Sequence, residues 1–318
     1  MPERKIGSRV APGPLWMLGA VTAFGVMVLF VKLLREAGMS TPEVMAWRMA
    51  PGVPVIALLL RRRKRPFVPR RPGAVAARVV FGATAMGTYF WSIQHLSLFT
   101  NAALALTQPV FVALLAPRIL GERPGRGVWL AFVLAAVGAT LVVTHRPRVA
   151  MAVGAASLGV PALVRLASAG SSALAHIFIR RATHADAARS EPDAPDTVVL
   201  HFMGWVALAA TVIGVADGAF RGPPPALSVS VTALYVTAMA VAGLGGQLML
   251  SRAYARGRAP SVALMGYAAV PLSLVFDAFI WGVGIQPMQL VGAVITVGAG
   301  VMLLLRGRAP QPDTQPRA

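Results

Sequence analysis

Residues 15–34 read LWMLGAVTAFGVMVLFVKLL, an apolar run whose only charged residue is Lys32. A helix rises about 1.5 Å per residue, so a run of this length matches the roughly 30 Å hydrocarbon core of a bilayer. The run is longer than the apolar region of a usual signal peptide, and no small-residue cleavage site follows it before Pro42. The stretch therefore predicts a retained membrane-spanning helix.

Further apolar runs of similar length follow along the chain, separated by short connectors rich in Pro, Gly and Arg. Together with the first, the ten predicted runs cover residues 15–34, 43–60, 74–94, 99–117, 127–144, 160–180, 197–217, 228–250, 259–281 and 286–305. Of the 318 residues 56% are hydrophobic and 13% are charged, and the mean hydropathy is +0.67. Such a chain has too little polar surface to coat a water-soluble globule. We predict an all-α integral membrane protein with ten transmembrane helices, embedded in a lipid bilayer.

The net charge of +19 would at first favour a nucleic-acid partner. Most of the 30 Lys and Arg residues, however, fall in alternate connectors, most densely in RRRKRPFVPRRPG at 61–73. Cytoplasmic loops of membrane proteins carry such an excess, and anionic lipid attracts it. The pattern predicts an inner-membrane protein with both termini in the cytoplasm and no nucleic-acid partner. This count assigns Arg78 to the connector at 61–73 and Arg180 to the connector after 160–180.

Several classes of chemistry have no support in the sequence. There is no Cys, and the five His residues show no metal-ligand spacing, so we expect neither a metal site nor a cofactor. No Walker motif occurs, and the ionisable groups inside the apolar runs lie at different depths, so we expect neither an ATPase nor an intramembrane enzyme. A carrier for a small-molecule substrate, a lipid translocase and a non-transporting membrane scaffold remain open, as does a homodimer.

The chain shows a weak internal duplication. A shift of 162 residues brings Pro109 onto Pro271 and Gly138 onto Gly300, and a shift of 148 brings Phe30 onto Phe178. The order of elements is the stronger indication, because each half contains five apolar runs. Five is odd, so the two halves would cross the membrane in opposite directions.

Two tracts carry a resemblance to a known family. TPEVMAWRMAPGV at 41–53 resembles the Arg-bearing second helix of the drug/metabolite transporter superfamily, EamA type, and TQPVFVALLAPRILGERPG at 107–125 is similar to its Pro-helix-Gly-Glu signature. In the second half 251–282 resembles the equivalent helix pair, but Gly284 stands where the family has a second Glu. The resemblance implies two inverted five-helix repeats around a central cavity, alternating access, and gradient-driven transport of a small organic metabolite.

These patterns together predict the domain organisation. Residues 1–14 form a cytoplasmic N-tail, 15–145 the first repeat, 146–306 the second repeat and 307–318 a disordered cytoplasmic C-tail.

Ionisable residues inside predicted spans are candidate binding or coupling groups, because they are costly in hydrocarbon without a partner or water. Arg48 lies in the run at 43–60, which Pro51 and Pro54 are predicted to interrupt. It could grip a carboxylate or phosphate, or serve as a structural clamp. Asp277 is predicted at a similar depth, where it would pair with Arg48 or titrate as a proton-coupling group. His176 and His201 could shuttle protons or bind substrate, whereas a lone His in a helix often bonds a neighbouring carbonyl.

Prolines near the predicted midplane mark a second set of candidates. Gln108 and Pro109 are predicted at the centre of one run and Pro271 at the centre of another, with Tyr267 one turn earlier. A Pro inside a helix removes one backbone hydrogen bond, and carriers built from inverted repeats place substrate contacts at such breaks. A simple kink is the alternative.

The remaining candidates are aromatic or amide side chains. Tyr89 and Trp91 are expected to line the cavity, and Gln247 is a further polar candidate, whereas the glycines before it are expected to allow close helix packing. Glu122 is expected to form an ion pair or a helix cap.

Overall fold

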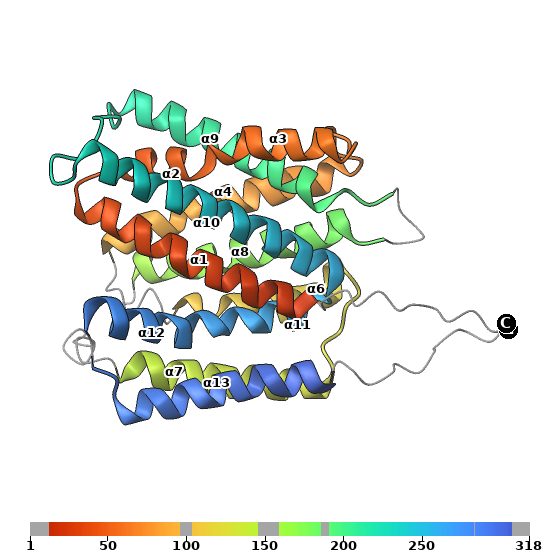
Figure 1. The fold of residues 1–318 in the computed structure, drawn as a ribbon. Helices are drawn as coiled ribbons and strands as arrows, with labels where there is room; N and C mark the ends of the chain where they lie inside the picture. Colours follow the sequence, from red (N-terminus) through yellow and green to blue (C-terminus); the bar gives the residue numbers. More distant parts are fainter. Residues whose placement is uncertain (1–12, 96–103, 146–158, 186–190, 283, 307–318) are drawn as a thin grey trace, which may run out of the picture. The chain divides into compact units, whose positions relative to one another are not determined.

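The computed structural model describes residues 13–95, 104–145, 159–185, 191–282 and 284–306, and within these ranges it contains helices and no strand. The helices are α1 (Gly13–Glu36), α2 (Thr41–Met49), α3 (Gly52–Arg62), α4 (Pro72–His95), α6 (Gln108–Ile119), α7 (Arg126–Thr144), α8 (Val160–Thr183), α9 (Pro195–Ala216), α10 (Val229–Arg256), α11 (Ala259–Leu264), the 3-10 helix η1 (Met265–Ala268), α12 (Ala269–Trp281) and α13 (Pro287–Arg306) (Figure 1). Six segments are long and apolar enough to cross a membrane, namely α1, α2–α3, α8, α9, α10 and 259–276. The all-helical, multi-pass class is confirmed. The count of ten spans and the orientation of the termini stay predictions, and residues 1–12 and the C-tail at 307–318 lie outside the described residues.

The predicted interruption of the second apolar run is confirmed. The Ser40 hydroxyl caps α2 by accepting a hydrogen bond from the Glu43 N–H at 3.2 Å, and Pro42 occupies the first turn. The helix ends at Met49 and α3 begins at Gly52, with Pro51 between them. Proline lacks the N–H that would continue the hydrogen-bond ladder, so the break lies where the sequence predicts it.

The Pro109 break differs in position from the prediction. Pro109 was expected at the centre of a helix over 99–117, but α6 begins at Gln108 and Pro109 occupies its first turn, after a short helical piece at 104–105 and a turn. The first turn is where a missing N–H costs nothing, because that N–H has no intrahelical acceptor.

The Pro271 region is also irregular, and the chain there changes from α11 through η1 to α12. The sequence predicts that Pro271 frees the Tyr267 carbonyl. That carbonyl and the Gly266 carbonyl instead accept hydrogen bonds from the Ala269 N–H, because the 3-10 turn supplies a closer donor.

The chain forms two compact units, and each draws on both halves of the sequence. Unit 1 comprises residues 1–80 and 175–258, and unit 2 comprises 81–174 and 259–318. In unit 1, α1 lies along α10 (Figure 1). A Cβ atom on Gly246 would lie 2.6 Å from the Phe24 ring, and one on Gly243 would lie 3.3 Å from Met27 Sδ. Gly243 and Gly246 confirm the expected role in close packing, whereas the expectation is wrong for Gly245, because a Cβ atom there would meet nothing within 4 Å.

In unit 2, α7 lies along α13 (Figure 1). A Cβ atom on Gly138 would lie 2.5 Å from the Gly292 carbonyl oxygen, and one on Gly292 would lie 2.5 Å from the Gly138 carbonyl oxygen. The Gln289 side chain donates a hydrogen bond to the Val142 carbonyl at 3.3 Å across the same pair. Two facing glycines therefore set the distance between these helices.

Unit 2 also confirms the structural role expected of Glu122. Its Oε2 accepts a hydrogen bond from the Ala259 N–H at 2.6 Å. Ala259 is the first residue of α11, so the carboxylate satisfies one of the N–H groups that have no partner within that helix.

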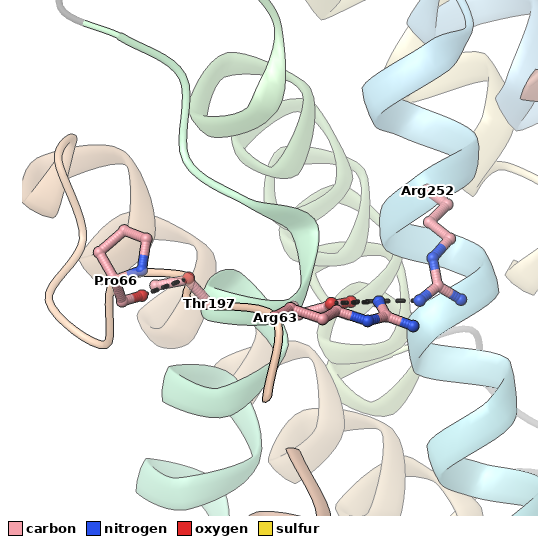
Figure 2. Close-up of polar contacts among 5 residues, drawn as sticks. Arg63, Pro66, Thr197 and Arg252 are labelled. Atoms are coloured by element: carbon pink, nitrogen blue, oxygen red, sulfur yellow. Dashed lines mark hydrogen bonds and ion pairs between the residues drawn. The ribbon is translucent and has the colours of Figure 1, made fainter. Parts of the chain in front are cut away.

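The connector between α3 and α4 is tied to the start of α9 by what we call the loop clamp, comprising Arg63, Pro66, Asp196, Thr197 and Arg252 (Figure 2). Asp196 accepts from Arg63 Nη1 at 2.8 Å and from Arg252 Nη2 at 3.3 Å, while the Thr197 hydroxyl donates to the Pro66 carbonyl at 2.8 Å. The clamp thus links the connector between α3 and α4 to α9 and α10.

Candidate functional site

Arg78 is the centre of the buried polar cluster in unit 1. It lies on α4, six residues after Pro72 and so about 9 Å along the helix, and only 4% of it is exposed. Its Nη2 donates a long hydrogen bond of 3.5 Å to Gln247 Oε1 on α10, and its guanidinium carbon lies 3.8 Å from the centre of the Phe202 ring on α9. Three helices therefore hold this cation inside the unit.

His176 and Tyr254 form the second part of the cluster. The Tyr254 hydroxyl lies 3.3 Å from His176 Nδ1, and the two rings are 5.1 Å apart. Tyr254 is fully buried on α10, and both residues interact electrostatically with Arg78. The structure thus brings together His176 and Gln247, two predicted candidates, around an arginine that the sequence analysis assigned to a loop.

Arg48 belongs to the same unit and is half-buried near the end of α2. Its Cγ is 3.6 Å from the position of a Cβ on Gly243, and its charge acts on Arg78. The predicted partner, Asp277, lies on α12, and its side chain is outside the described part of the structure. The Arg48–Asp277 ion pair stays a prediction.

His201 lies apart from the Arg78 cluster in the contacts it makes. Its Nε2 is 3.0 Å from the Phe67 carbonyl in the connector between α3 and α4. A bond to a nearby carbonyl is the alternative that the sequence analysis gives for a histidine in a helix. This contact also ties α9 to the connector that the loop clamp holds. A role in coupling stays a prediction.

Unit 2 brings the two predicted backbone breaks together. The Tyr267 hydroxyl, from η1, donates a 2.8 Å hydrogen bond to the Leu106 carbonyl in the turn before α6. Gln108 and Pro109 directly follow that turn, and Pro271 lies four residues after Tyr267. The Tyr267 hydroxyl therefore satisfies a backbone acceptor that the break leaves without a helical partner.

We expect Tyr267→Phe to lower the free energy of unfolding by about 1 kcal/mol, because it removes this hydrogen bond and little apolar volume. The melting temperature of the purified protein in detergent measures the effect. Tyr235→Phe is the matched control, since the Tyr235 ring packs 5.6 Å from Phe30 and its hydroxyl makes no hydrogen bond within the described residues. Equal melting temperatures for the two variants would contradict the role of the Tyr267 hydroxyl.

The aromatic candidates Tyr89 and Trp91 lie on the second half of α4, in unit 2, and are about 40% exposed. The Tyr89 ring lies 4.9 Å from the guanidinium carbon of Arg165, a buried arginine on α8. Cation–π contact offsets part of the cost of burying that charge. Whether the two aromatic residues line a solute pathway stays a prediction.

Sequence reasoning missed Arg78, Arg180 and Tyr254 as parts of the site. Arg180 is buried on α8 and donates to the carbonyls of Tyr254 at 3.3 Å and Ala255 at 3.1 Å, which caps the end of α10. A signal for Arg78 was present, because it lies inside the apolar run at 74–94 and not in the connector before it.

Comparison with known proteins gives the chain a family context. Residues 11–144 match the model of the EamA-like transporter family. The chain is 27% identical over 289 residues to the pseudopaline exporter CntI of Pseudomonas aeruginosa (strain UCBPP-PA14), with 90% of this chain and 95% of that protein covered. It is 24% identical over 301 residues to an uncharacterized transporter of Helicobacter pylori (strain 26695), with 92% and 94% covered.

A solved crystal structure of a protein with 16% sequence identity matches the fold with a TM-score of 0.75 and covers 93% of this chain and 97% of that chain. At this identity the match shows the fold alone. The similarities to the EamA-like family and to the named transporters indicate a multi-pass membrane transporter.

Proposed function

We propose that the chain is a transporter of the drug/metabolite transporter superfamily, EamA type, and that it is a secondary transporter that exports a small organic metabolite across a bacterial inner membrane. The observation that carries this proposal is the buried polar cluster around Arg78, Gln247 and His176, set among apolar helices. Ionisable groups inside membrane helices are costly and therefore rare, and those that occur commonly mark a solute or ion pathway. Export is the direction named for the Pseudomonas aeruginosa relative.

The proposed architecture is ten spans in two inverted five-helix repeats, with both termini in the cytoplasm. The packing inside unit 2 supports it, because α7 and α13, which the 162-residue shift superposes, lie against each other. Elements related by a twofold axis meet when they lie next to that axis. The connector at 61–73 and the fourth connector, around Glu122, would then lie on the cytoplasmic side.

The proposed mechanism is alternating access driven by an ion gradient. Each of the two units takes helices from both halves of the chain, so a motion of repeat elements would change the surroundings of the Arg78 cluster. The proposed substrate-contacting and coupling residues are the candidates from the sequence: Arg48, Tyr89, Trp91, Gln108, Pro109, His176, His201, Gln247, Tyr267, Pro271 and Asp277.

The test compares the medium of bacterial cells that express the wild-type chain with that of cells carrying an empty vector, by untargeted mass spectrometry. We expect at least one small organic compound to accumulate outside the cells only when the chain is present, and to enter inverted membrane vesicles less rapidly once the proton gradient is dissipated. A membrane-inserted chain that changes the level of no compound would overturn the proposal.

A further inference from the structure

Arg78 is a buried cation without a carboxylate partner. Within the described part of the chain it forms no ion pair, and its contacts are the long hydrogen bond to Gln247, the Phe202 ring and the electrostatic interactions given above. Burial of a charge costs several kcal/mol unless a counter-charge or strong hydrogen bonds offset it. The observed contacts use one of five guanidinium N–H donors.

Two buried carboxylates of unit 1, Asp193 and Asp196, are engaged elsewhere. Asp196 is held by Arg63 and Arg252 in the loop clamp. Asp193 accepts from the backbone N–H groups of Arg70 at 2.6 Å and Arg71 at 3.1 Å. These two acidic residues therefore stabilise the loops and are not available to Arg78.

Arg180 is a buried arginine of the same unit whose hydrogen bonds give it a structural role. It is 5% exposed, almost the same as Arg78, but its Nη1 donates to two backbone carbonyls at the end of α10. Among the residues that the structure describes, no backbone carbonyl accepts a hydrogen bond from Arg78. Arg180 is therefore a helix cap, whereas Arg78 keeps guanidinium N–H donors that bind no acceptor among the described residues.

The free donors of Arg78 are not sealed inside the protein. Among the described residues, the one buried polar side-chain atom without a hydrogen-bond partner is Nε1 of Trp16. The guanidinium nitrogens that make no hydrogen bond therefore keep some accessible surface, although the residue as a whole is almost covered.

The surroundings of Arg78 favour a negatively charged ligand. Arg48 adds a second positive charge within electrostatic range, and the Tyr254 hydroxyl and the Gln247 side-chain amide add further polar groups. The Phe202 ring covers one face of the guanidinium and leaves its edge for in-plane hydrogen bonds. A planar guanidinium edge matches two oxygens of one carboxylate or phosphate.

We propose that Arg78 binds the carboxylate or phosphate group of the exported solute, with Gln247 orienting the guanidinium and Arg48 adding to the positive potential. The substrate class is thus a small organic anion. This inference rests on the proposed transport function and deepens it, since it names the class of substrate and the residue that recognises it.

The experiment repeats the export comparison with wild type, Arg78→Gln, Arg78→Lys and Arg62→Gln. Arg62 lies exposed at the end of α3 in the same unit, so its substitution removes the same charge outside the cluster. We expect the compounds whose export depends on the chain to carry a carboxylate or phosphate. Arg78→Gln should lower their export at least about ten-fold, Arg78→Lys less, and Arg62→Gln not at all. The melting temperature of each variant in detergent shows that it is folded.

A binding measurement on the purified protein separates the two proposals. The probes are succinate against succinamide, and glycerol 3-phosphate against glycerol, scored by the rise in melting temperature. Anions that stabilise wild type and not Arg78→Gln support the inference even if no exported compound is found, in which case the transport proposal alone fails. Export of neutral or cationic compounds only, or full export by a folded Arg78→Gln variant, overturns the inference and leaves transport standing.

A lipid phosphate is the other source of the same chemistry. If a lipid phosphate binds Arg78, phosphatidylglycerol added to the detergent raises the melting temperature of wild type and not that of Arg78→Gln, while the soluble anions raise neither. That outcome would overturn the assignment of Arg78 to a solute.

Discussion

Gly138→Ala is expected to lower the free energy of unfolding by about 2 kcal/mol, because the new methyl group has no room between α7 and α13. The Cβ atom of that alanine would lie 2.5 Å from the Gly292 carbonyl oxygen and 2.8 Å from the Thr296 backbone nitrogen. Neither atom belongs to a flexible side-chain end, so the helices must separate and lose contact along their length. The measurement is the melting temperature of the purified protein in detergent.

Gly245→Ala is the matched control for that substitution. Gly245 is also inside a helix, α10, but a Cβ atom there meets nothing within 4 Å. Alanine has the higher helix propensity, so we expect the melting temperature to stay the same or rise slightly. If Gly138→Ala behaved like Gly245→Ala, the close approach of α7 and α13 would be wrong.

Asp196→Asn is expected to cost about 2 kcal/mol of unfolding free energy, because charge-assisted hydrogen bonds to two arginines are lost. The Asp196 side chain is 8% exposed, whereas that of Arg63 is 50% exposed, which keeps the expected loss well below that of a fully buried pair. Thermal or denaturant unfolding in detergent measures it, and the connector at 61–73 should become more sensitive to protease.

Glu36→Gln provides the comparison for the loop clamp. Glu36 pairs with Lys32 at 3.8 Å on the surface of α1, with both side chains about half exposed. Exposed pairs of this kind contribute little, so we expect a change below about 0.5 kcal/mol. A loss for Asp196→Asn as small as that for Glu36→Gln would show that the clamp does not stabilise unit 1.

The helical class followed from the sequence because apolar runs long enough to span a membrane leave the backbone few alternatives. The break at Pro51 followed for a similar reason, since proline cannot continue a helix. The exact place of Pro109 could not be predicted. A proline ends a helix before it or starts one after it, and only the packing of α6 against α11 and the Tyr267 bond to Leu106 distinguish the two.

The candidate site was predictable only in part. Gln247 and His176 were identified as polar residues inside apolar runs, and the structure brings both to Arg78. Arg78 was not identified as a site residue, because it lies close to a basic connector in the sequence. Counting charges by connector does not distinguish an exposed arginine from a buried one. That distinction depends on α9 and α10, which supply Phe202 and Gln247 from more than a hundred residues away in the chain.

In the proposed topology the helices cross a bilayer with the Arg78 end of unit 1 facing the cytoplasm. The chain contains no cysteine, so Arg62→Cys and Arg221→Cys each introduce one thiol. A membrane-impermeant maleimide applied to intact cells should label Cys at 221 only, and should label Cys at 62 only in inverted vesicles. Labelling of both positions from the same side would contradict the account.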